Sequence, residues 1–321
     1  MKLTGKRVLV TGGAGFIGSN LVDRIIKENP SELVIADNFF LGEEQNLMEA
    51  RKSFPNLKVY RVDAADLASM REMTENEKIE VLFNLAVIPL PMSLKYPRWT
   101  ISTNIEIATT CCELARLNCI QTLIHCSSSE AYGSALYLPM DENHPRNGTT
   151  PYAASKSAED MIVLPYLRTY NIDAVIGRPF NNFGPRQNPG SYAGIIPIVI
   201  KKVLSNQPIQ IFGDGEQTRD YIFVRETANA FVQLYEEPTT RGLEINIATG
   251  KEITVNELVR DLLRIMKAPN HPVTHTDARI GEVRKHCGDI SLARKVIGFE
   301  SNPITDDQLE ETVAWYIDRL K

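Results

Sequence analysis

The stretch RVLVTGGAGFIG, residues 7–18, decides how this chain folds. Its first residues favour a β-strand, and glycines at positions 12, 15 and 18 then lead into an amphipathic helical stretch, Gly18–Lys27. Glycine permits a tight turn, lets the backbone approach a pyrophosphate and allows a helix to pack closely on a strand. The start of the helix offers free N–H groups to phosphates. A structural turn can show the same glycines, but this context predicts a dinucleotide site formed by Gly12, Gly15, Phe16, Ile17 and Gly18.

The same alternation of strand and helix continues along the chain. Further apolar runs are nearly continuous in Val, Ile and Leu, which is typical of parallel strands buried on both faces. Amphipathic stretches such as Thr103–Leu117 separate them. The pattern predicts an α/β fold with a doubly wound parallel sheet of the Rossmann type. The predicted strands after Arg7–Thr11 are Leu33–Asp37, Val59–Asp63, Val81–Ala86, Thr122–Ser127, Ala174–Arg178 and Leu243–Ala248.

Turn signals become frequent after about residue 178 and suggest a second unit. Two helical stretches, Ile195–Leu204 and Val255–Met266, and a short β-like piece, Ile209–Phe212, follow there. We therefore expect a dinucleotide-binding domain from residues 1–177 and about 219–250. A smaller C-terminal α/β substrate domain would comprise about 178–218 and 251–321.

Composition excludes several classes of function. The 321 residues carry a formal net charge of −5, which argues against a nucleic-acid partner. No apolar run reaches the roughly 18 residues needed to span a bilayer, and the N-terminal residues do not resemble a signal peptide. The five cysteines form no CxxC pair, and Pro272 separates the only histidines at helical spacing, His271 and His275. We expect a cytoplasmic protein with reduced thiols and no metal site.

Two aspartates follow predicted strands and are candidate cofactor contacts. Asp37 ends the second strand, 19 residues after Gly18. A carboxylate there accepts hydrogen bonds from the ribose hydroxyls of the adenosine and repels a 2′-phosphate, which favours NAD over NADP. Asp63 ends the third predicted strand and is a candidate partner of the adenine amino group. Each of them can also be an ordinary turn or cap residue.

Tyr152 and Lys156 form a candidate catalytic pair. Residues four apart lie on one face of a helix, so the phenol and the ammonium point the same way. Free tyrosine has a pKa of about 10, and lowering it by about 3 units needs about 4 kcal/mol, which a buried cation and the positive ring of NAD⁺ can supply. Ser128, after the fifth strand, can bridge a substrate hydroxyl and Tyr152, although the serine run also fits a capping turn.

The motifs TGGAGFIG, SSSEAYG, PYAASK, RPFNNFGPRQ and FGDGEQTRDYIFV occur in this order over nearly the whole chain. The chain thereby resembles the NAD-dependent epimerase/dehydratase family, the extended short-chain dehydrogenases. This resemblance implies a tightly held NAD and a nucleotide-diphosphate sugar whose carbon, usually C4, is oxidised and later takes the hydride back. It also implies a homodimer formed by the helices Thr103–Leu117 and Tyr152–Tyr170, with Ile105, Leu114, Met161 and Leu164 as apolar contacts.

The resemblance also assigns residues by position. Tyr152 would be the base, Lys156 would lower its pKa and bind the nicotinamide ribose, and Ser128 would be the hydroxyl partner. Ala86 would contact the cofactor. Asn181, Arg219 and Arg279 resemble the positions that hold the diphosphate, a task that suits the arginine fork. Ile209 and Phe212 would line the pocket of the nucleotide base.

Two departures from the family pattern bear on the reaction. The loop Asn84–Pro91, with Ile88-Pro89-Leu90-Pro91, matches no subgroup, and we expect it to face the sugar. Ser128-Ser129-Glu130 resembles the Thr-x-Glu of sugar 4,6-dehydratases and glucuronate decarboxylases, whereas simple 4-epimerases usually lack this acid. A carboxylate near C5 of a 4-keto sugar can remove the C5 proton. Glu130 can also be an inert residue at the start of a helix.

Several reactions therefore stay open. The sequence ranks 4,6-dehydration and 4-epimerisation nearly level, with decarboxylation third. A plain dehydrogenase would release NADH instead of recycling it. A non-catalytic NAD-binding redox sensor would be favoured by the loss of Tyr152 or Lys156, and both residues are present.

Overall fold

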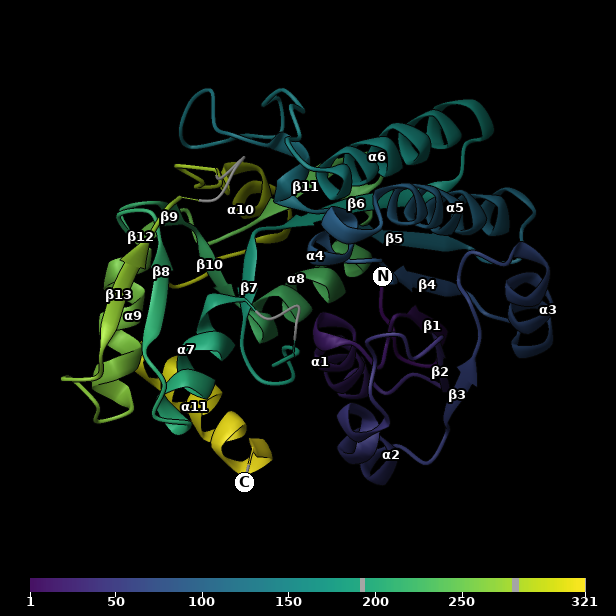
Figure 1. The fold of residues 1–321 in the computed structure, drawn as a ribbon. Helices are drawn as coiled ribbons and strands as arrows, with labels where there is room; N and C mark the ends of the chain where they lie inside the picture. The colour runs from purple at the N-terminus through teal and green to yellow at the C-terminus, as the bar shows by residue number, and fades with distance from the viewer. Residues whose placement is uncertain (191–193, 279–282, 321) are drawn as a thin grey trace.

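A seven-stranded parallel sheet forms the centre of the computed structural model, which describes residues 1–190, 194–278 and 283–320. Its strand order is β11-β6-β5-β4-β1-β2-β3, and every neighbouring pair runs parallel (Figure 1). The doubly wound α/β prediction is confirmed. The strands are β1 (Arg7–Thr11), β2 (Glu32–Asp37), β3 (Leu57–Arg61), β4 (Val81–Asn84), β5 (Thr122–Cys126), β6 (Asp173–Pro179) and β11 (Glu244–Ile247).

Most strand bounds lie within a residue or two of the predicted ones. Strand β3 begins and ends two residues earlier than the predicted run 59–63, so Asp63 lies beyond its end. The apolar residue Val62 continues the pattern past the last paired residue, Arg61, which is why periodicity alone extended the strand.

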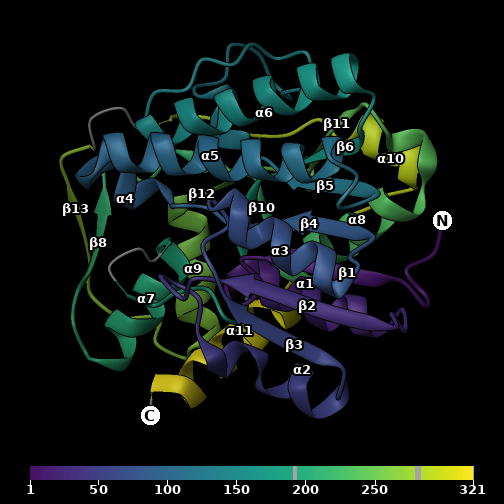
Figure 2. The ribbon, with the colours of Figure 1, turned by 90° about the vertical axis from the view of Figure 1, so that its right-hand side faces the viewer.

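Helices cover both faces of the sheet because successive side chains of each strand point to opposite faces. Val8 and Val10 of β1 belong to one core, and Leu9 between them belongs to the other. One face is covered by α3 (Leu67–Glu77), α5 (Pro97–Arg116) and α6 (Pro151–Tyr170), and the other by α1 (Phe16–Ile26), α2 (Met48–Ser53), α8 (Val224–Glu236) and α10 (Ser291–Ile297). Figure 2 looks toward the face of the sheet that α3 and α5 cover, with the strands behind them.

Helix α6 starts where the sequence favours a helix start. Thr150 caps it by accepting a 3.1 Å hydrogen bond from the Ala153 N–H, and Pro151 occupies the first helical position, where no N–H is needed. Asn171 ends the helix in the left-handed conformation, with φ of 54°. Both ends are therefore set by local residues, and Tyr152 is held in the first turn.

A smaller unit stands beside the sheet and has its own core, which includes Ile200, Leu258 and Tyr316 (Figure 1). Two pairs of very short strands, β7 (Asn181–Phe183) with β10 (Tyr221–Phe223) and β9 (Thr218–Arg219) with β12 (Ile253–Thr254), lie where the chain passes between the two units. The unit contains α7 (Ile195–Leu204), β8 (Ile209–Phe212), α9 (Val255–Ile265), β13 (Val273–Thr276) and α11 (Asp306–Leu320).

Helix α10 lies on the sheet side although the sequence division placed all of 251–321 in the smaller unit. Ala293 of α10 and Phe299 just after it belong to the core formed by β1, β11 and α8. The chain thus returns to the sheet for a short segment before α11. Hydrophobic periodicity identifies such a helix but cannot say which core it joins.

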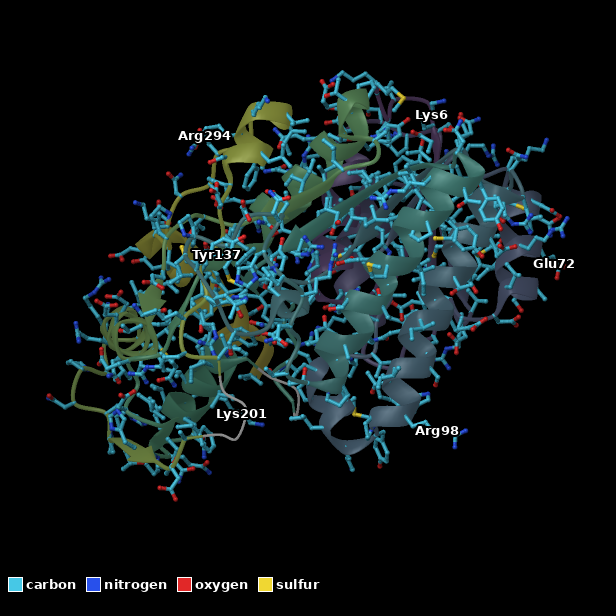
Figure 3. All side chains as sticks on the ribbon, turned by 90° about the horizontal axis from the view of Figure 1, so that it is seen from above. Lys6, Glu72, Arg98, Tyr137, Lys201 and Arg294 are labelled. Atoms are coloured by element: carbon cyan, nitrogen blue, oxygen red, sulfur yellow. The ribbon has the colours of Figure 1, made fainter. Side chains whose placement is uncertain are left out.

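Charged side chains of both signs are spread around the rim of the molecule, as Glu72, Arg98, Lys201 and Arg294 illustrate in Figure 3. Many form local ion pairs, for example Arg294 with Glu300 at 2.6 Å. The absence of a nucleic-acid partner stays a prediction.

Candidate active site

A cavity of about 740 Å³ lies between the carboxyl ends of the sheet strands and the smaller unit. Ligands of doubly wound sheets bind at this edge. The cavity brings together nearly all residues that the sequence singled out. The predicted residues that line it are Gly12, Gly15, Phe16, Ile17, Gly18, Asp37, Asp63, Ala86, Ser128, Glu130, Tyr152, Lys156, Asn181, Phe212 and Arg219.

Two predicted substrate contacts are not among these lining residues. Ile209 is fully buried in the core of the smaller unit, while Gln210, Ile211 and Phe212 of the same strand line the cavity. A short strand turns alternate side chains inward, and in β8 the first of them belongs to the core. Arg279 lies outside the described residues.

The glycine turn fits a dinucleotide on geometric grounds. Gly12 has φ of 65°, and a Cβ there would lie 2.8 Å from the backbone nitrogen of Ala86. A Cβ on Gly18 would overlap the carbonyl oxygen of Gly12. Helix α1 starts beside this turn with no side-chain cap, and its first two residues, Phe16 and Ile17, line the cavity. Backbone donors at a helix start suit a pyrophosphate.

Asp37 sits at the end of β2 with its carboxylate held by backbone groups. It accepts hydrogen bonds from the N–H of Ala14 at 2.9 Å and of Phe39 at 2.8 Å. A Cβ on Gly42 would lie 2.7 Å from both carboxylate oxygens, so the loop after β2 passes closely over them. Burial raises the pKa of Asp37, and the two N–H donors oppose that rise. The carboxylate oxygens have acceptor capacity left for ribose hydroxyls, and their charge would meet a 2′-phosphate.

Asp63 and Ala86 line the cavity on either side of β1. Asp63 accepts a 3.0 Å hydrogen bond from the Ala65 N–H, so it also forms the turn that was its alternative explanation. The N–H of Ala86 donates to the Thr11 hydroxyl at 3.3 Å. The backbone after β4 is thereby tied to the end of β1 beside the glycine turn.

Lys156 and Tyr152 lie on the inner face of α6. Lys156 is 2% exposed, and its ammonium donates to the carbonyl of Cys126 at 2.8 Å and to Glu159 at 2.6 Å. Burial raises the pKa of Tyr152 to about 12, while Lys156 and a hydrogen bond with Ser128 act to lower it. Lys156 thus acts in the expected direction, but in the protein alone burial outweighs it.

Glu130 directly follows the serine run 127–129 and lines the same cavity as Tyr152 and Ser128. It belongs to a short 3-10 helix, Ser129–Tyr132, whose cap is the Ser128 hydroxyl accepting from the Glu130 N–H at 3.2 Å. Burial raises the pKa of Glu130, and nearby Arg219 lowers it. Ser129, by contrast, is buried and does not line the cavity. Glu130 therefore lines the site, whereas Ser129 does not.

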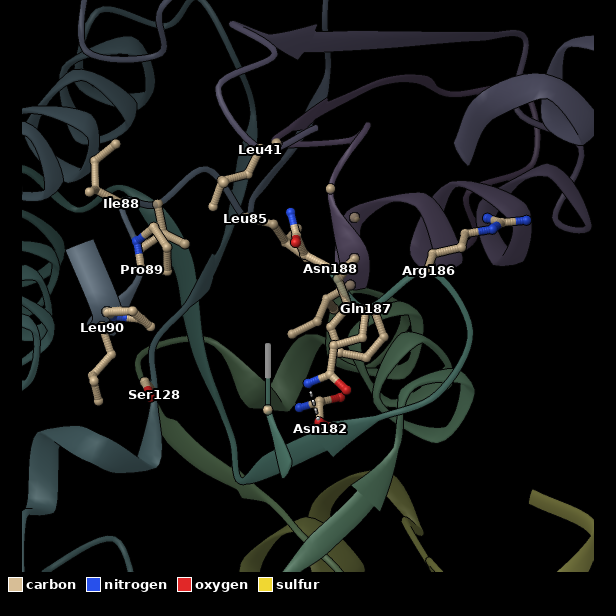
Figure 4. Close-up of a pocket in the computed structure, with 18 of the residues that line it drawn as sticks. Leu41, Leu85, Ile88, Pro89, Leu90, Ser128, Asn182, Arg186, Gln187 and Asn188 are labelled. Atoms are coloured by element: carbon tan, nitrogen blue, oxygen red, sulfur yellow. Dashed lines mark hydrogen bonds between the residues drawn. The ribbon is translucent and has the colours of Figure 1, made fainter. Parts of the chain in front are cut away.

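The unusual loop forms an apolar wall of the cavity. All residues from Leu85 to Pro91 line it, and Figure 4 shows Ile88, Pro89 and Leu90 together on the side of Ser128. The Asn104 side chain of α5 fixes the backbone of Ile88 by accepting from its N–H at 2.7 Å and donating to its carbonyl at 3.1 Å. Leu90–Lys95 continues as the short helix α4.

The opposite wall is polar. Asn182, Gln187 and Asn188 lie across the cavity from the apolar loop (Figure 4), and Gln187 donates to the Asn182 carbonyl at 3.3 Å. Asn181 of β7 approaches the His286 ring at 3.4 Å. Burial beside Arg219 lowers the pKa of His286 to about 4, so this ring is neutral at neutral pH.

Some lining residues come from parts of the chain that sequence reasoning did not connect with a site. Trp315 and Arg319 of the last helix, α11, reach the cavity, and Arg319 contacts Glu43 and lies 2.7 Å from Gln45 on the loop after β2. Helical periodicity identified no function for this helix. Only the folded chain brings positions almost three hundred residues apart together.

Among the described residues, no group of three or more His, Cys, Asp or Glu side chains could hold a metal ion. In the same ranges, none of the helices has the length and apolar character to cross a membrane. All five cysteines are free thiols, and four of them are buried.

Comparison with known proteins matches a model of the NAD dependent epimerase/dehydratase family to residues 8–248. The UDP-glucose 4-epimerase of Mycolicibacterium smegmatis is 33% identical, over 97% of this chain and 98% of that protein. The dTDP-glucose 4,6-dehydratase of Neisseria gonorrhoeae is 30% identical, over 98% of this chain and 96% of that protein. The structure of UDP-N-acetylglucosamine 4-epimerase from Methanobrevibacter ruminantium is similar with a TM-score of 0.91 and 33% identity, over 98% of this chain and 99% of that one.

Proposed function

We propose a specific reaction for this chain. The chain belongs to the NAD-dependent epimerase/dehydratase family and is an NAD-dependent enzyme that acts on nucleotide sugars. The reaction is 4,6-dehydration of a pyrimidine-nucleotide hexose through a 4-keto intermediate, with 4-epimerisation as the second candidate. One observation carries this order. Glu130 is a carboxyl group of raised pKa in the same cavity as Tyr152, Lys156 and Ser128.

The dinucleotide end of the cavity would hold NAD through the glycine turn, Asp37 and Asp63. The N–H groups at the start of α1 would bind the pyrophosphate, and Asp37 would accept the ribose hydroxyls. When bound, NAD supplies the hydride acceptor that oxidises the sugar and later returns the hydride. Because Asp37 is closely covered by the loop at Gly42, we expect little room for a 2′-phosphate.

Tyr152 would take the proton of the C4 hydroxyl as the base. Ser128 would bridge that hydroxyl and the phenol, and the buried ammonium of Lys156 would favour the phenolate. General-base catalysis of this kind contributes about 10²–10⁴ to a rate. The rigid start of α6 at Thr150 and Pro151 holds Tyr152 in place for it.

Glu130 would act at C5 once C4 is a ketone. The ketone makes the C5 proton acidic, so a carboxylate can remove it while the C5–C6 double bond forms and the C6 hydroxyl leaves. The other acids that line the cavity, Asp37, Glu43 and Asp63, lie around the dinucleotide end. We therefore assign Glu130 both roles: it takes the C5 proton and gives it to the departing hydroxyl, which leaves as water. A raised pKa suits a group that both gains and loses a proton.

The nucleotide would bind at the smaller unit. Asn181 and Arg219 would hold the diphosphate, with Arg279 as a further candidate from the family resemblance. Phe212, together with Gln210 and Ile211, would line the base pocket instead of Ile209. UDP and dTDP sugars are the ligands of the similar proteins, so a pyrimidine base is proposed here.

Association and location stay predictions. We propose that α5 and α6 form a homodimer interface, in which Met161, 57% exposed, is available for contact. Leu114 and Leu164 cannot contribute as expected, because both are buried in the core of their own chain. The free thiols suit the proposed cytoplasmic location.

The reaction can be tested by incubating the NAD-loaded enzyme with a panel of UDP and dTDP hexoses and measuring product masses. Loss of one water supports dehydration. An unchanged mass with a new chromatographic peak supports epimerisation, which the similarity to 4-epimerases favours. Loss of carbon dioxide from a glucuronate would instead identify a decarboxylase, and accumulation of free NADH would identify a plain dehydrogenase.

A further inference from the structure

A second acid, Glu159, lies beside the catalytic pair, and neither the motifs nor the proposed reaction uses it. Glu159 is on α6, three residues after Lys156, and is 1% exposed. One of its oxygens accepts the 2.6 Å hydrogen bond from the Lys156 ammonium. Its other oxygen has no hydrogen-bond partner among the described residues. Lys156 is therefore its main stabilising partner.

His125 lies on the other side of Glu159, and the position of its ring proton can be assigned from hydrogen-bond directions. The Thr11 hydroxyl accepts from the N–H groups of Leu85 and Ala86, so its own proton goes to the Asn84 side-chain carbonyl at 2.6 Å. The Asn84 amide group then faces His125 Nδ1 at 3.1 Å as a donor. Nδ1 must be an acceptor, so a ring bearing one proton carries it on Nε2.

That second nitrogen points at Glu159. His125 Nε2 lies 3.2 Å from the same Glu159 oxygen that binds Lys156, although the angle does not meet hydrogen-bond geometry. His125 is fully buried. The group of three thus brings together the Lys156 ammonium, the Glu159 carboxylate and the His125 imidazole, whose partners place its ring proton on Nε2.

We propose that Glu159 is a positioning residue that cancels the charge of Lys156, so that Tyr152 takes its base form only when the oxidised dinucleotide adds a positive charge beside it. This inference rests on the proposed role of Tyr152 as the base. In the oxidised complex Tyr152 accepts the proton of the sugar hydroxyl. In the reduced complex Tyr152 is neutral and can return that proton as the hydride returns to the sugar.

The other groups around α6 do not disturb this charge balance. Cys126 of β5 and Cys111 of α5 face Glu159, and burial raises the pKa of Cys126 to about 12 and that of Cys111 well above its usual value, so both are uncharged thiols. Asp160, the next residue, pairs with Arg178 of β6 at 2.6 Å. On the 3-10 helix Ser129–Tyr132, whose Ala131 carbonyl accepts from the Ser157 hydroxyl of α6, Glu130 faces Arg219. Lys156 acts to lower the pKa of Tyr152, and Glu159 acts to raise it.

A titration of Tyr152 tests the proposal without relying on turnover. The purified protein is loaded with NAD⁺, or with the bound cofactor reduced to NADH by borohydride, and tyrosinate absorbance is recorded against pH. Subtraction of the same titration of Tyr152→Phe isolates this residue. We expect wild-type Tyr152 to ionise at least about one pH unit lower with NAD⁺ than with NADH. Equal midpoints in the two forms would overturn the proposal, and this measurement needs no change at Glu159.

The substitution Glu159→Gln then separates charge from structure. If Glu159 cancels the charge of Lys156, both midpoints should move down by about one pH unit, because the ammonium acts unopposed. If Glu159 only holds Lys156 in place, its loss should move the midpoints up, and this result would contradict the proposal. Glu159→Asp keeps the charge and should restore the wild-type midpoints. Glu113→Gln removes an acid of α5 that accepts a 2.7 Å hydrogen bond from Tyr166 of α6, and it should leave the Tyr152 midpoints unchanged.

The outcomes also distinguish this proposal from the proposed function. Near-full activity of Tyr152→Phe would remove Tyr152 as the base. The titration reads the phenol directly, so the Glu159 result can fail while Tyr152 keeps its catalytic role.

Discussion

The two ends of the cavity are built in different ways. At the dinucleotide end, the glycine turn follows β1, Asp37 is the last residue of β2 and Asp63 lies just beyond β3, so each is placed by one of the first three strands. At the sugar end, the walls combine the apolar loop Leu85–Pro91, Glu130 and residues of the smaller unit. The first end is suited to NAD, on which the family depends. The second end depends on side chains from distant segments.

The substitution expected to have the largest effect is Tyr152→Phe, at the boundary between the two ends. It removes a proton acceptor and little volume, so turnover should fall by about 10²–10⁴. Binding of NAD and of the nucleotide sugar, measured by calorimetry, should stay nearly intact. Tyr166→Phe makes the same change on the same helix, outside the cavity, and should keep wild-type turnover. Near-full activity of Tyr152→Phe would move the catalytic role elsewhere.

Glu130→Gln tests the sugar end alone and should lower turnover by about 10², the lower end of the range for a general base. A dehydratase lacking this carboxylate should stall after oxidation, so NADH absorbance should build up in a single turnover. C5 should then retain its proton in deuterated water. A 4-epimerase needs no step at C5, and full activity of the variant would leave epimerisation as the better account.

The control for that experiment is Glu226→Gln on α8. Burial also raises the pKa of Glu226, which accepts hydrogen bonds from Ser301 and, at 3.2 Å, from Gln308. It does not line the cavity. A similar loss of activity in this control would point to a general effect of removing a buried acid, and thermal melts of both variants should show which lose stability.

Asp37→Ala tests the dinucleotide end alone. Loss of a charged acceptor should weaken NAD binding about 10- to 100-fold and relax discrimination against NADP, with little effect on the product formed. Asp37→Asn keeps an acceptor for the Ala14 and Phe39 N–H groups and should relax discrimination with a smaller loss of NAD affinity. Fluorescence titration with both dinucleotides measures this. Tighter binding of NADP than NAD by the wild type would contradict the assignment of Asp37.

The smallest effect is expected where α11 meets the cofactor loop. Arg319→Ala breaks the contacts with Glu43 and Gln45, which are partly exposed and so worth little each. We expect NAD to dissociate roughly two- to five-fold faster, with turnover on saturating substrate nearly unchanged. Stopped-flow release of NAD would measure this. A large loss of turnover would mean that α11 couples the dinucleotide end of the cavity to the sugar end, and would contradict the separation of the two ends.

Several features could be read from the chain because they depend on neighbouring residues. Hydrophobic periodicity located the strands of the large sheet and several of the helices, and the bounds of α7 and β8 agree with those predicted. The glycine turn, Asp37 and the Tyr152–Lys156 pair were identifiable since a turn, a strand end and one helical turn fix their geometry. Glu130 was recognisable from its place after the serine run, and the structure puts it in the cavity.

Other features depended on the folded chain. Ile209 belongs to a core and not to the cavity, α10 joins the sheet side, and Arg319 reaches a loop near the N-terminus. His125, which lies beside Glu159, and Asn84, which contacts His125, come from two different strands. The pKa of Tyr152 illustrates the physical reason. Its lysine partner is visible in the sequence, but the burial that outweighs that lysine is the sum of many distant contacts, and only tertiary packing determines that sum.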